Sequence, residues 1–278
     1  MIYVEILGRM GNQMFSYAMA KRLQKSYPGQ KIAFDFKNFK TNDETWINYI
    51  EKFKCASEVI VEGRKLNIIQ RLILHFYFKK HKQIKGWINI KRFEEKYADI
   101  LEIFGIYIYC VGYHEFKYKS LFKNKLLLGF YESPAYFDCI ADTVRDGLSV
   151  EEANSVLKDI LQDIEAHTAI AVGVRRGDFV SESNRKFCDV CTPKYYKNGI
   201  KLICKELKDR NITKADLKIY IFTDDIDWTR ENLKCDLPLR YITSSVNGEL
   251  KPWEMMQVLS HCKYQVISNS SFFGGDST

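Results

Sequence analysis

The sequence lacks the features of an exported or membrane-spanning protein. Its first eight residues, MIYVEILG, contain no basic stretch and no apolar run of signal-peptide length. The longest apolar run, residues 72–78, is interrupted by His75 and is far shorter than the roughly 20 apolar residues that a membrane span requires. These absences predict a cytoplasmic protein.

Cysteine is present but lacks the density and spacing of a structural framework. Eight cysteines are scattered along 278 residues, which does not resemble a secreted disulfide scaffold and predicts reduced thiols. Cys188 and Cys191 form a CxxC pair, but no second pair follows at zinc-ribbon spacing. The sequence therefore predicts no metal site.

Two familiar nucleotide-binding motifs are also missing. The turn GRMGNQ, residues 8–13, lies between a predicted strand and a predicted helix, yet it lacks the Lys-Ser/Thr ending of a P-loop and does not match G-x-G-x-x-G. The second mismatch weakens an NAD-binding interpretation. Backbone N–H groups and the helix dipole at such a turn suit a phosphate or carboxylate. A tight turn with Asn12 as a helix cap is the structural alternative.

Composition describes an ordinary globular protein. Apolar residues make up 46% of the chain, which is enough for one large α/β domain or two smaller ones. The net charge of +7 suggests an anionic partner, whether nucleic acid, a membrane surface or a phosphorylated substrate. Charge alone favours none of the three.

The order of predicted elements indicates a parallel α/β architecture. A strand over residues 3–7, a turn, a helix from near Gln13 towards Tyr27 and a strand over residues 31–36 form one α/β unit. Three further helix and strand pairs follow in the second half, with helices over residues 151–165, 193–207 and 253–260 and strands over residues 169–174, 217–222 and 264–267. This repetition predicts a Rossmann-like half.

We place a domain boundary near residue 149, where Asp146-Gly147 interrupts the chain. Residues 1–149 then form an N-terminal domain on the acceptor side, and residues 150–278 form a C-terminal nucleotide-binding domain. The middle segment, from about residue 38 to 136, is rich in lysine and aromatic residues and has poor periodicity. By exclusion, we assign acceptor specificity to it.

Polar clusters follow several predicted strands, where parallel sheets bind their ligands. The strongest is VGVRRGD, residues 172–178, in which an apolar strand runs directly into Arg175 and Arg176. An arginine at a strand end can hold a diphosphate and neutralise the charge that grows on a leaving group. Asp178 could orient an arginine or act as a base. An Arg-Asp ion pair that closes a loop is the alternative.

Two more clusters follow later strands. Thr223, Asp224 and Asp225 precede an acidic helix start, where carboxylates could hold a ribose or a nucleobase; helix capping would account for one of the aspartates. The other cluster offers hydroxyl and amide groups or forms a plain turn, and consists of Ser268, Asn269, Ser270 and Ser271.

Together the four clusters resemble the ordered motifs of the bacterial α-1,2-fucosyltransferases. The matching segments are GRMGNQM (8–14), RRGDF (175–179), TDD (223–225) with Trp228 and Glu231-Asn232, and SNSSF (268–272), and they span nearly the whole chain in the family order. Many relatives carry a histidine at the position of Gly173. The family also continues beyond the last motif, so we expect the C-terminal domain to be shortened at its end.

The resemblance implies a GT-B-like fold of two Rossmann-like domains facing a cleft. It implies an inverting galactoside 2-α-L-fucosyltransferase that moves fucose from GDP-fucose to the 2-hydroxyl of a terminal galactose on a glycan, with no metal or other cofactor. Arg175 would take the donor β-phosphate, and Arg176 and Asp178 would complete that site. The residues expected to bind GDP-fucose are Gly11, Asn12, Gln13, Arg175, Arg176, Thr223, Asp224, Asp225, Asn269, Ser270 and Ser271.

Two other functions remain open from the residues alone. Asp225-Ile226-Asp227 resembles the D-x-D of metal-dependent glycosyltransferases, which use other sugar nucleotides. The basic segment 78–82 could instead belong to a non-enzymatic polyanion-binding protein, although no RNA-binding signature is present, and nucleic acid is not an expected partner. These lysines could also favour peripheral association with an anionic membrane.

Overall fold

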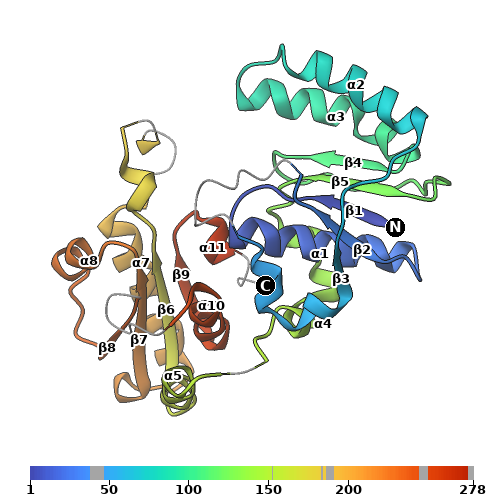
Figure 1. The fold of residues 1–278 in the computed structure, drawn as a ribbon. Coiled ribbons are helices and arrows are strands. Elements are labelled where there is room, and N and C mark those ends of the chain that lie inside the picture. Colours follow the sequence, from blue (N-terminus) through green and yellow to red (C-terminus); the bar gives the residue numbers. More distant parts are fainter. Residues whose placement is uncertain (38–46, 152, 183, 186–190, 244–249, 275–278) are drawn as a thin grey trace. The chain divides into compact units, whose positions relative to one another are not determined.

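A computed structural model describes the chain except residues 38–46, 152, 183, 186–190, 244–249 and 275–278. The described chain divides into two compact units, residues 1–149 and 150–277. Each unit contains one parallel sheet with helices (Figure 1). Among the described residues, no helix combines the length and the apolar character needed to cross a bilayer.

The N-terminal unit is built on a five-stranded sheet of order β3-β2-β1-β5-β4. Its strands are β1 (Ile2–Glu5), β2 (Ile32–Asp35), β3 (Val59–Val61), β4 (Ile106–Tyr109) and β5 (Lys125–Gly129), and every pair is parallel. Its helices are α1 (Met10–Ser26), α2 (Ile68–His81), α3 (Trp87–Ile103) and α4 (Ala141–Gly147). Short 3₁₀ turns complete it, at Tyr49–Lys52, Lys54–Glu58, Pro134–Tyr136 and Asp138–Ile140.

Alternation along these strands decides which helices cover each face of the sheet. Tyr3, Ile106 and Leu126 point to one face, where they form a buried cluster with Leu74 and Tyr77 of α2. Tyr107 follows Ile106 in β4, so its side chain points to the opposite face of the sheet. There its hydroxyl lies 3.0 Å from the hydroxyl of Tyr27, the residue that directly follows α1. The α2–α3 hairpin therefore covers one face, and α1 lies on the other.

The C-terminal unit contains a four-stranded parallel sheet of order β8-β7-β6-β9. Its strands are β6 (Thr168–Val174), β7 (Leu217–Thr223), β8 (Leu239–Ile242) and β9 (Tyr264–Ile267). Its helices are α5 (Ser155–Glu165), α7 (Pro193–Asp209), α8 (Ile226–Asn232), α10 (Pro252–His261) and α11 (Ser271–Gly274). Two 3₁₀ turns lie at Gly177–Val180 and Lys214–Asp216.

Two predicted helix starts are wrong. The first helix begins at Met10 rather than near Gln13, because Gly8, at φ +78°, makes the turn and Arg9 precedes the helix. Asn12 therefore lies inside α1, so the interpretation of Asn12 as its cap is also wrong. The helix expected from residue 151 begins at Ser155, where the side chain of Asn154 accepts a hydrogen bond from Leu157 N at 2.8 Å.

Each sheet reverses its strand order at one point, and this point lies beside a predicted motif. In the C-terminal unit, β7 and β8 extend the sheet on one side of β6, and β9 pairs on the other side. In the N-terminal unit, β2 and β3 lie on one side of β1, and β5 and β4 on the other. Ligands of open α/β sheets bind beyond the carboxyl ends of strands at such switch points.

Candidate active site

The carboxyl edge of the C-terminal sheet brings three of the four predicted clusters together. Val174 of β6 pairs with Thr223 of β7, so the arginines that follow β6 lie beside the aspartates that follow β7. Gly173 pairs with Ile267 of β9, which places the serine-rich segment on the other flank. The parallel register thus collects side chains that are far apart in sequence at the switch point of this sheet.

Arg175 is held between two carboxylates. Its Nη2 donates to Asp178 Oδ1 at 2.7 Å, and its Nη1 lies 2.8 Å from Asp224 Oδ2. The side chain remains 28% exposed, so its guanidinium is fixed in direction and still reachable by a ligand. Such a charge can bind an anion without first being ordered. Since one Asp178 oxygen receives the Arg175 hydrogen bond, Asp178 acts here as an orienting group.

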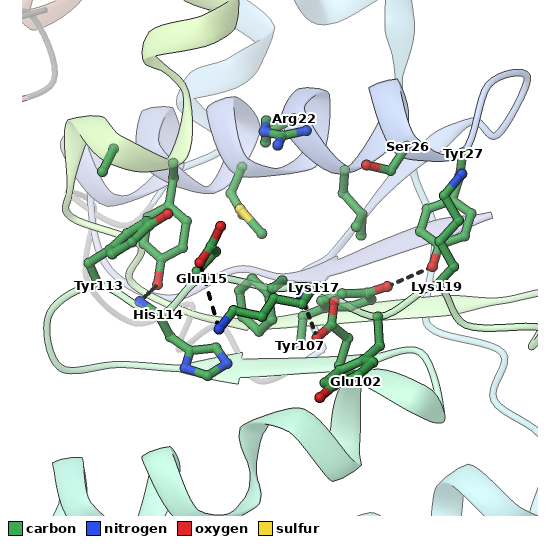
Figure 2. Close-up of a pocket in the computed structure, with 16 residues that line it drawn as sticks. Arg22, Ser26, Tyr27, Glu102, Tyr107, Tyr113, His114, Glu115, Lys117 and Lys119 are labelled. Carbon is green, nitrogen blue, oxygen red and sulfur yellow. Dashed lines mark hydrogen bonds and ion pairs between the residues drawn. The ribbon is translucent and has the colours of Figure 1, made fainter.

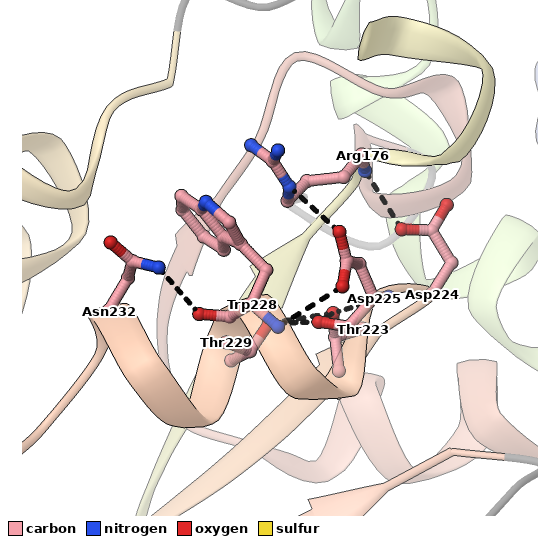
Figure 3. Close-up of polar contacts among 7 residues, drawn as sticks. All are labelled: Arg176, Thr223, Asp224, Asp225, Trp228, Thr229 and Asn232. Atoms are coloured by element: carbon pink, nitrogen blue, oxygen red, sulfur yellow. Dashed lines mark hydrogen bonds and ion pairs between the residues drawn. The ribbon is translucent and has the colours of Figure 1, made fainter.

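Arg176 is fixed from three directions (Figure 3). Its backbone N–H donates to Asp224 Oδ1 at 2.8 Å, and its Nε donates to Asp225 Oδ2 at 3.0 Å. Its guanidinium carbon lies 4.0 Å from the centre of the Trp228 ring, within the range of a cation–π contact. Asp224 therefore contacts both arginines, one through the Arg175 side chain and the other through the Arg176 backbone.

Asp225 and Thr223 also build the start of α8. Asp225 Oδ1 accepts from Trp228 N at 3.2 Å as the helix cap, so the capping interpretation holds for this aspartate. Thr223 Oγ1 accepts from Asp225 N at 3.0 Å and lies 2.9 Å from the Oγ1 of buried Thr229. Thr223 and Asp225 thus hold the loop in place, Asp225 also contacts Arg176, and Asp224 contacts both arginines.

The serine-rich cluster forms a turn that leads into α11. Ser268 N donates to Gly173 O at 2.9 Å, and Ser270 Oγ accepts from Phe272 N at 3.3 Å. The buried ring of Phe273 then lies against Gly173, where an added Cβ would be only 2.8 Å from the ring. Glycine at this position leaves the space that Phe273 occupies.

A pocket of about 210 Å³ opens beside Arg175 at this edge. Pockets for drug-sized ligands span about 300–1,000 Å³, so this one suits part of a larger ligand, such as a single ring system. It combines charged, hydroxyl and apolar groups from three strand ends and two helices, among them Arg175, Thr223, Asp224, Thr243, Met255 and Phe272. Thr243 and Met255 were not predicted from the sequence. Thr243 directly follows β8, so its position after a strand could have indicated it.

The amino-terminal motif belongs to the other unit and includes a buried glutamine. Gln13 is fully buried; its Nε2 donates to Ile47 O at 2.9 Å and its Oε1 accepts from Tyr49 N at 2.9 Å. The side chain therefore ties the start of α1 to residues 47–49. Gly11 and Asn12 lie in the first turn of α1, whose leading N–H groups have no partner within the helix.

A second pocket, of about 180 Å³, lies wholly within the N-terminal unit (Figure 2). It is lined by Ser26 and Tyr27 at the carboxyl end of α1, by the segment 113–119, and by buried Glu102. Burial raises the pKa of Glu102, although Lys117 N donates to its Oε2 at 2.9 Å. Because α1 ends at the amino edge of the sheet, this part of the pocket is far along the strands from the switch point.

Across the described ranges, no group of three or more His, Cys, Asp or Glu side chains is arranged to hold a metal ion. Asp225 of the D-x-D segment is engaged with Arg176 and with the start of α8. Cys188 of the CxxC pair lies outside the described residues.

Solved structures share this fold. The fucosyltransferase NodZ from Bradyrhizobium aligns with a TM-score of 0.55 at 13% identity, over 99% of this chain and 91% of that one. A structure of NodZ α-1,6-fucosyltransferase soaked with GDP-fucose aligns with a TM-score of 0.52, also at 13% identity and with the same coverage. The predicted GT-B-like fold of two Rossmann-like units is confirmed.

The sequence comparison makes the assignment more specific. Residues 1–274 match Glycosyl transferase family 11, and the chain belongs to this family. It is 23% identical to an α-1,2-colitosyltransferase of Escherichia coli, over 98% of this chain and 84% of the relative. It is 24% identical to the O-antigen biosynthesis glycosyltransferase WbnK of Escherichia coli, over 98% and 87%. The family resemblance seen in the motifs is confirmed.

Proposed function

We propose that this glycosyltransferase transfers fucose from GDP-fucose to the 2-hydroxyl of a terminal galactose, with inversion at the anomeric carbon. The observation that carries the donor assignment is the arginine pair fixed by aspartates beside a pocket at the sheet switch point. A diphosphate carries the charge that such a pair binds, and the pocket beside it can take a ring of the nucleotide. A structure of the similar NodZ was soaked with GDP-fucose, which supports the same donor class.

In the proposed reaction, the acceptor oxygen attacks the anomeric carbon while the bond from that carbon to the β-phosphate oxygen breaks. GDP leaves with an additional negative charge, and the acceptor proton passes to a base or to solvent. Arg175 and Arg176 stabilise the leaving diphosphate because their charges are already oriented by Asp224, Asp178 and Asp225. The reaction needs no metal if these two cations neutralise the leaving group.

Arg175 provides the direct test. Arg175→Lys keeps a positive charge but loses the planar fork that reaches Asp178 and Asp224 together, so we expect kcat/KM to fall by about 10²-fold or more. Arg175→Ala should reduce transfer further. Arg230→Ala on α8 is the matched control, since Arg230 stacks over Tyr241 and does not line the pocket. Turnover of Arg175→Ala equal to that of the control would remove Arg175 from the mechanism.

A second donor deserves the same assay, because one relative transfers colitose. The similarity to an α-1,2-colitosyltransferase extends over 98% of this chain and favours a deoxysugar donor in general. With lactose as acceptor, we therefore expect product from GDP-fucose. The rate of product formation is compared with the rates from GDP-colitose, GDP-mannose and UDP-galactose. Faster transfer from GDP-colitose would show that colitose, and not fucose, is the preferred donor sugar. Transfer from UDP-galactose alone would contradict the proposal.

A further inference from the structure

The α2–α3 hairpin exposes large apolar side chains on its outer surface. Ile69, Leu72 and Phe76 of α2 are 48%, 51% and 60% exposed. Their spacing of three and four residues places them on one helical face, whereas Leu74 and Tyr77 on the opposite face are buried against the sheet. The helix is therefore apolar on both sides, although only one side is used by the fold.

The start of α3 extends this apolar surface. Trp87 and Ile88 begin α3 and are 62% and 71% exposed. The two helices lie side by side, joined by the short segment 82–86 (Figure 1). Single exposed apolar residues need no explanation, but several on one hairpin indicate an interaction surface. Tryptophan is also favoured where one end of a side chain is apolar and the other is hydrated.

The first part of the same hairpin carries charges of one sign, whereas residues 94–103 of α3 add Glu94, Glu95, Asp99 and Glu102. Residues 67–93 contain seven Lys and Arg and no Asp or Glu, so the net charge of this segment, +7, is as large as that of the whole chain. Lys79, Lys80, Lys82 and Lys85 are all exposed, and they lie in sequence between Phe76 and Trp87. Phe76, Trp87 and these four lysines thus lie towards the end of the hairpin where α2 and α3 join, and Ile69 and Leu72 lie farther back along α2.

We propose that the α2–α3 hairpin binds peripherally to the surface of an anionic lipid bilayer. Basic residues near such a surface each contribute about 1 kcal/mol, and exposed apolar side chains enter the headgroup region. A second copy of the chain fits less well, since a symmetric contact would bring two sets of seven positive charges together. The hairpin and Arg175 belong to different units, so the proposal does not depend on the donor assignment.

Vesicle flotation of the purified full-length protein tests the proposal. We expect binding to vesicles of phosphatidylglycerol and phosphatidylcholine, weak binding to phosphatidylcholine alone, and release in high salt. The triple variant Lys79→Glu/Lys80→Glu/Lys82→Glu should lower the partition coefficient by tenfold or more. Lys201→Glu/Lys205→Glu/Lys208→Glu, which changes exposed lysines of α7 by the same charge, should lower it much less.

The apolar contribution needs a separate pair of variants. Leu72→Ser/Phe76→Ser should reduce vesicle binding severalfold, whereas Leu121→Ser/Leu202→Ser, at sites 99% and 59% exposed, should leave it nearly unchanged. Circular dichroism and transfer to a soluble acceptor should match wild type in all four variants. Equal binding to both vesicle types, or equal losses in the test and control variants, would overturn the proposal. So would a dimer in ultracentrifugation that Leu72→Ser/Phe76→Ser abolishes, combined with no vesicle binding by the wild type.

Discussion

The ion-pair network of Asp163 lends itself to a quantitative test of stability. Asp163, in the last turns of α5, accepts from Lys218 of β7 and Arg240 of β8 at 2.7 and 2.8 Å. Burial alone would raise the pKa of Asp163, but the hydrogen bonds from these two cations outweigh it and hold the pKa at about 2, below the ordinary 3.8. Asp163→Asn should therefore destabilise the C-terminal unit.

The size and the pH dependence follow from that shift. A carboxyl with a lowered pKa in the folded state contributes stability above its ordinary pKa and loses it as the pH falls through the folded value. The shift corresponds to about 2 kcal/mol at pH 5, and about half of this should be lost by pH 3. The difference between Asp163→Asn and wild type should shrink accordingly.

Hydrogen exchange of the β6, β7 and β8 amides in wild type and variant measures this difference within the C-terminal unit. Asp209→Asn, at an exposed aspartate that ends α7, is the matched control and should change exchange little at either pH. A destabilisation by Asp163→Asn that is the same at pH 5 and pH 3 would refute the electrostatic account, because it would then arise from packing or shape.

Three further outcomes can be checked with standard assays. Gln13→Ala should lower unfolding stability by about 2 kcal/mol in urea titration, since it leaves the buried Tyr49 N–H without its side-chain acceptor; Gln24→Ala, on the same helix, is the comparison. Gly173→Ala should force the Phe273 ring to shift, which should lower the free energy of unfolding by about 1–3 kcal/mol and weaken GDP binding in calorimetry. An unchanged affinity for GDP would show that the position of this ring does not affect ligand binding. Transfer should continue in EDTA, and a complete loss restored by Mn²⁺ would favour the metal-dependent alternative.

The middle of the N-terminal unit could not be assigned from its sequence, and the exposed face of α2 explains why. Helices are recognised because apolar residues recur on one face and polar residues on the other. In α2, Leu72 and Phe76 face outward while Leu74 and Tyr77 face inward, so the pattern becomes nearly continuous and loses its period. The exposed apolar residues of α2 thus made the helix unpredictable from the sequence, and the same residues indicate an interaction surface.

The order of the strands in the sheets could not be predicted from the sequence either. β5 inserts between β1 and β4, so the switch point of the N-terminal sheet lies between strands that are separated by more than 100 residues. Pairing over such distances depends on which buried faces fit together. For the same reason, the roles of Gln13, which holds residues 47–49, and of Phe273, which fills the space above Gly173, became visible only in three dimensions.

By itself, the sequence determined the α/β class and the positions of the polar motifs, because buried parallel strands are short apolar runs and the residues after them are necessarily at the sheet edge. Both can be predicted from consecutive residues, such as VGVRR at 172–176, because they depend only on local sequence. Only the tertiary structure decided which carboxylate serves which arginine. Asp224 contacts both Arg175 and Arg176, whereas Asp225 contacts Arg176 and also caps α8. These roles differ because the parallel register of β6 and β7 fixes how each neighbouring side chain is directed.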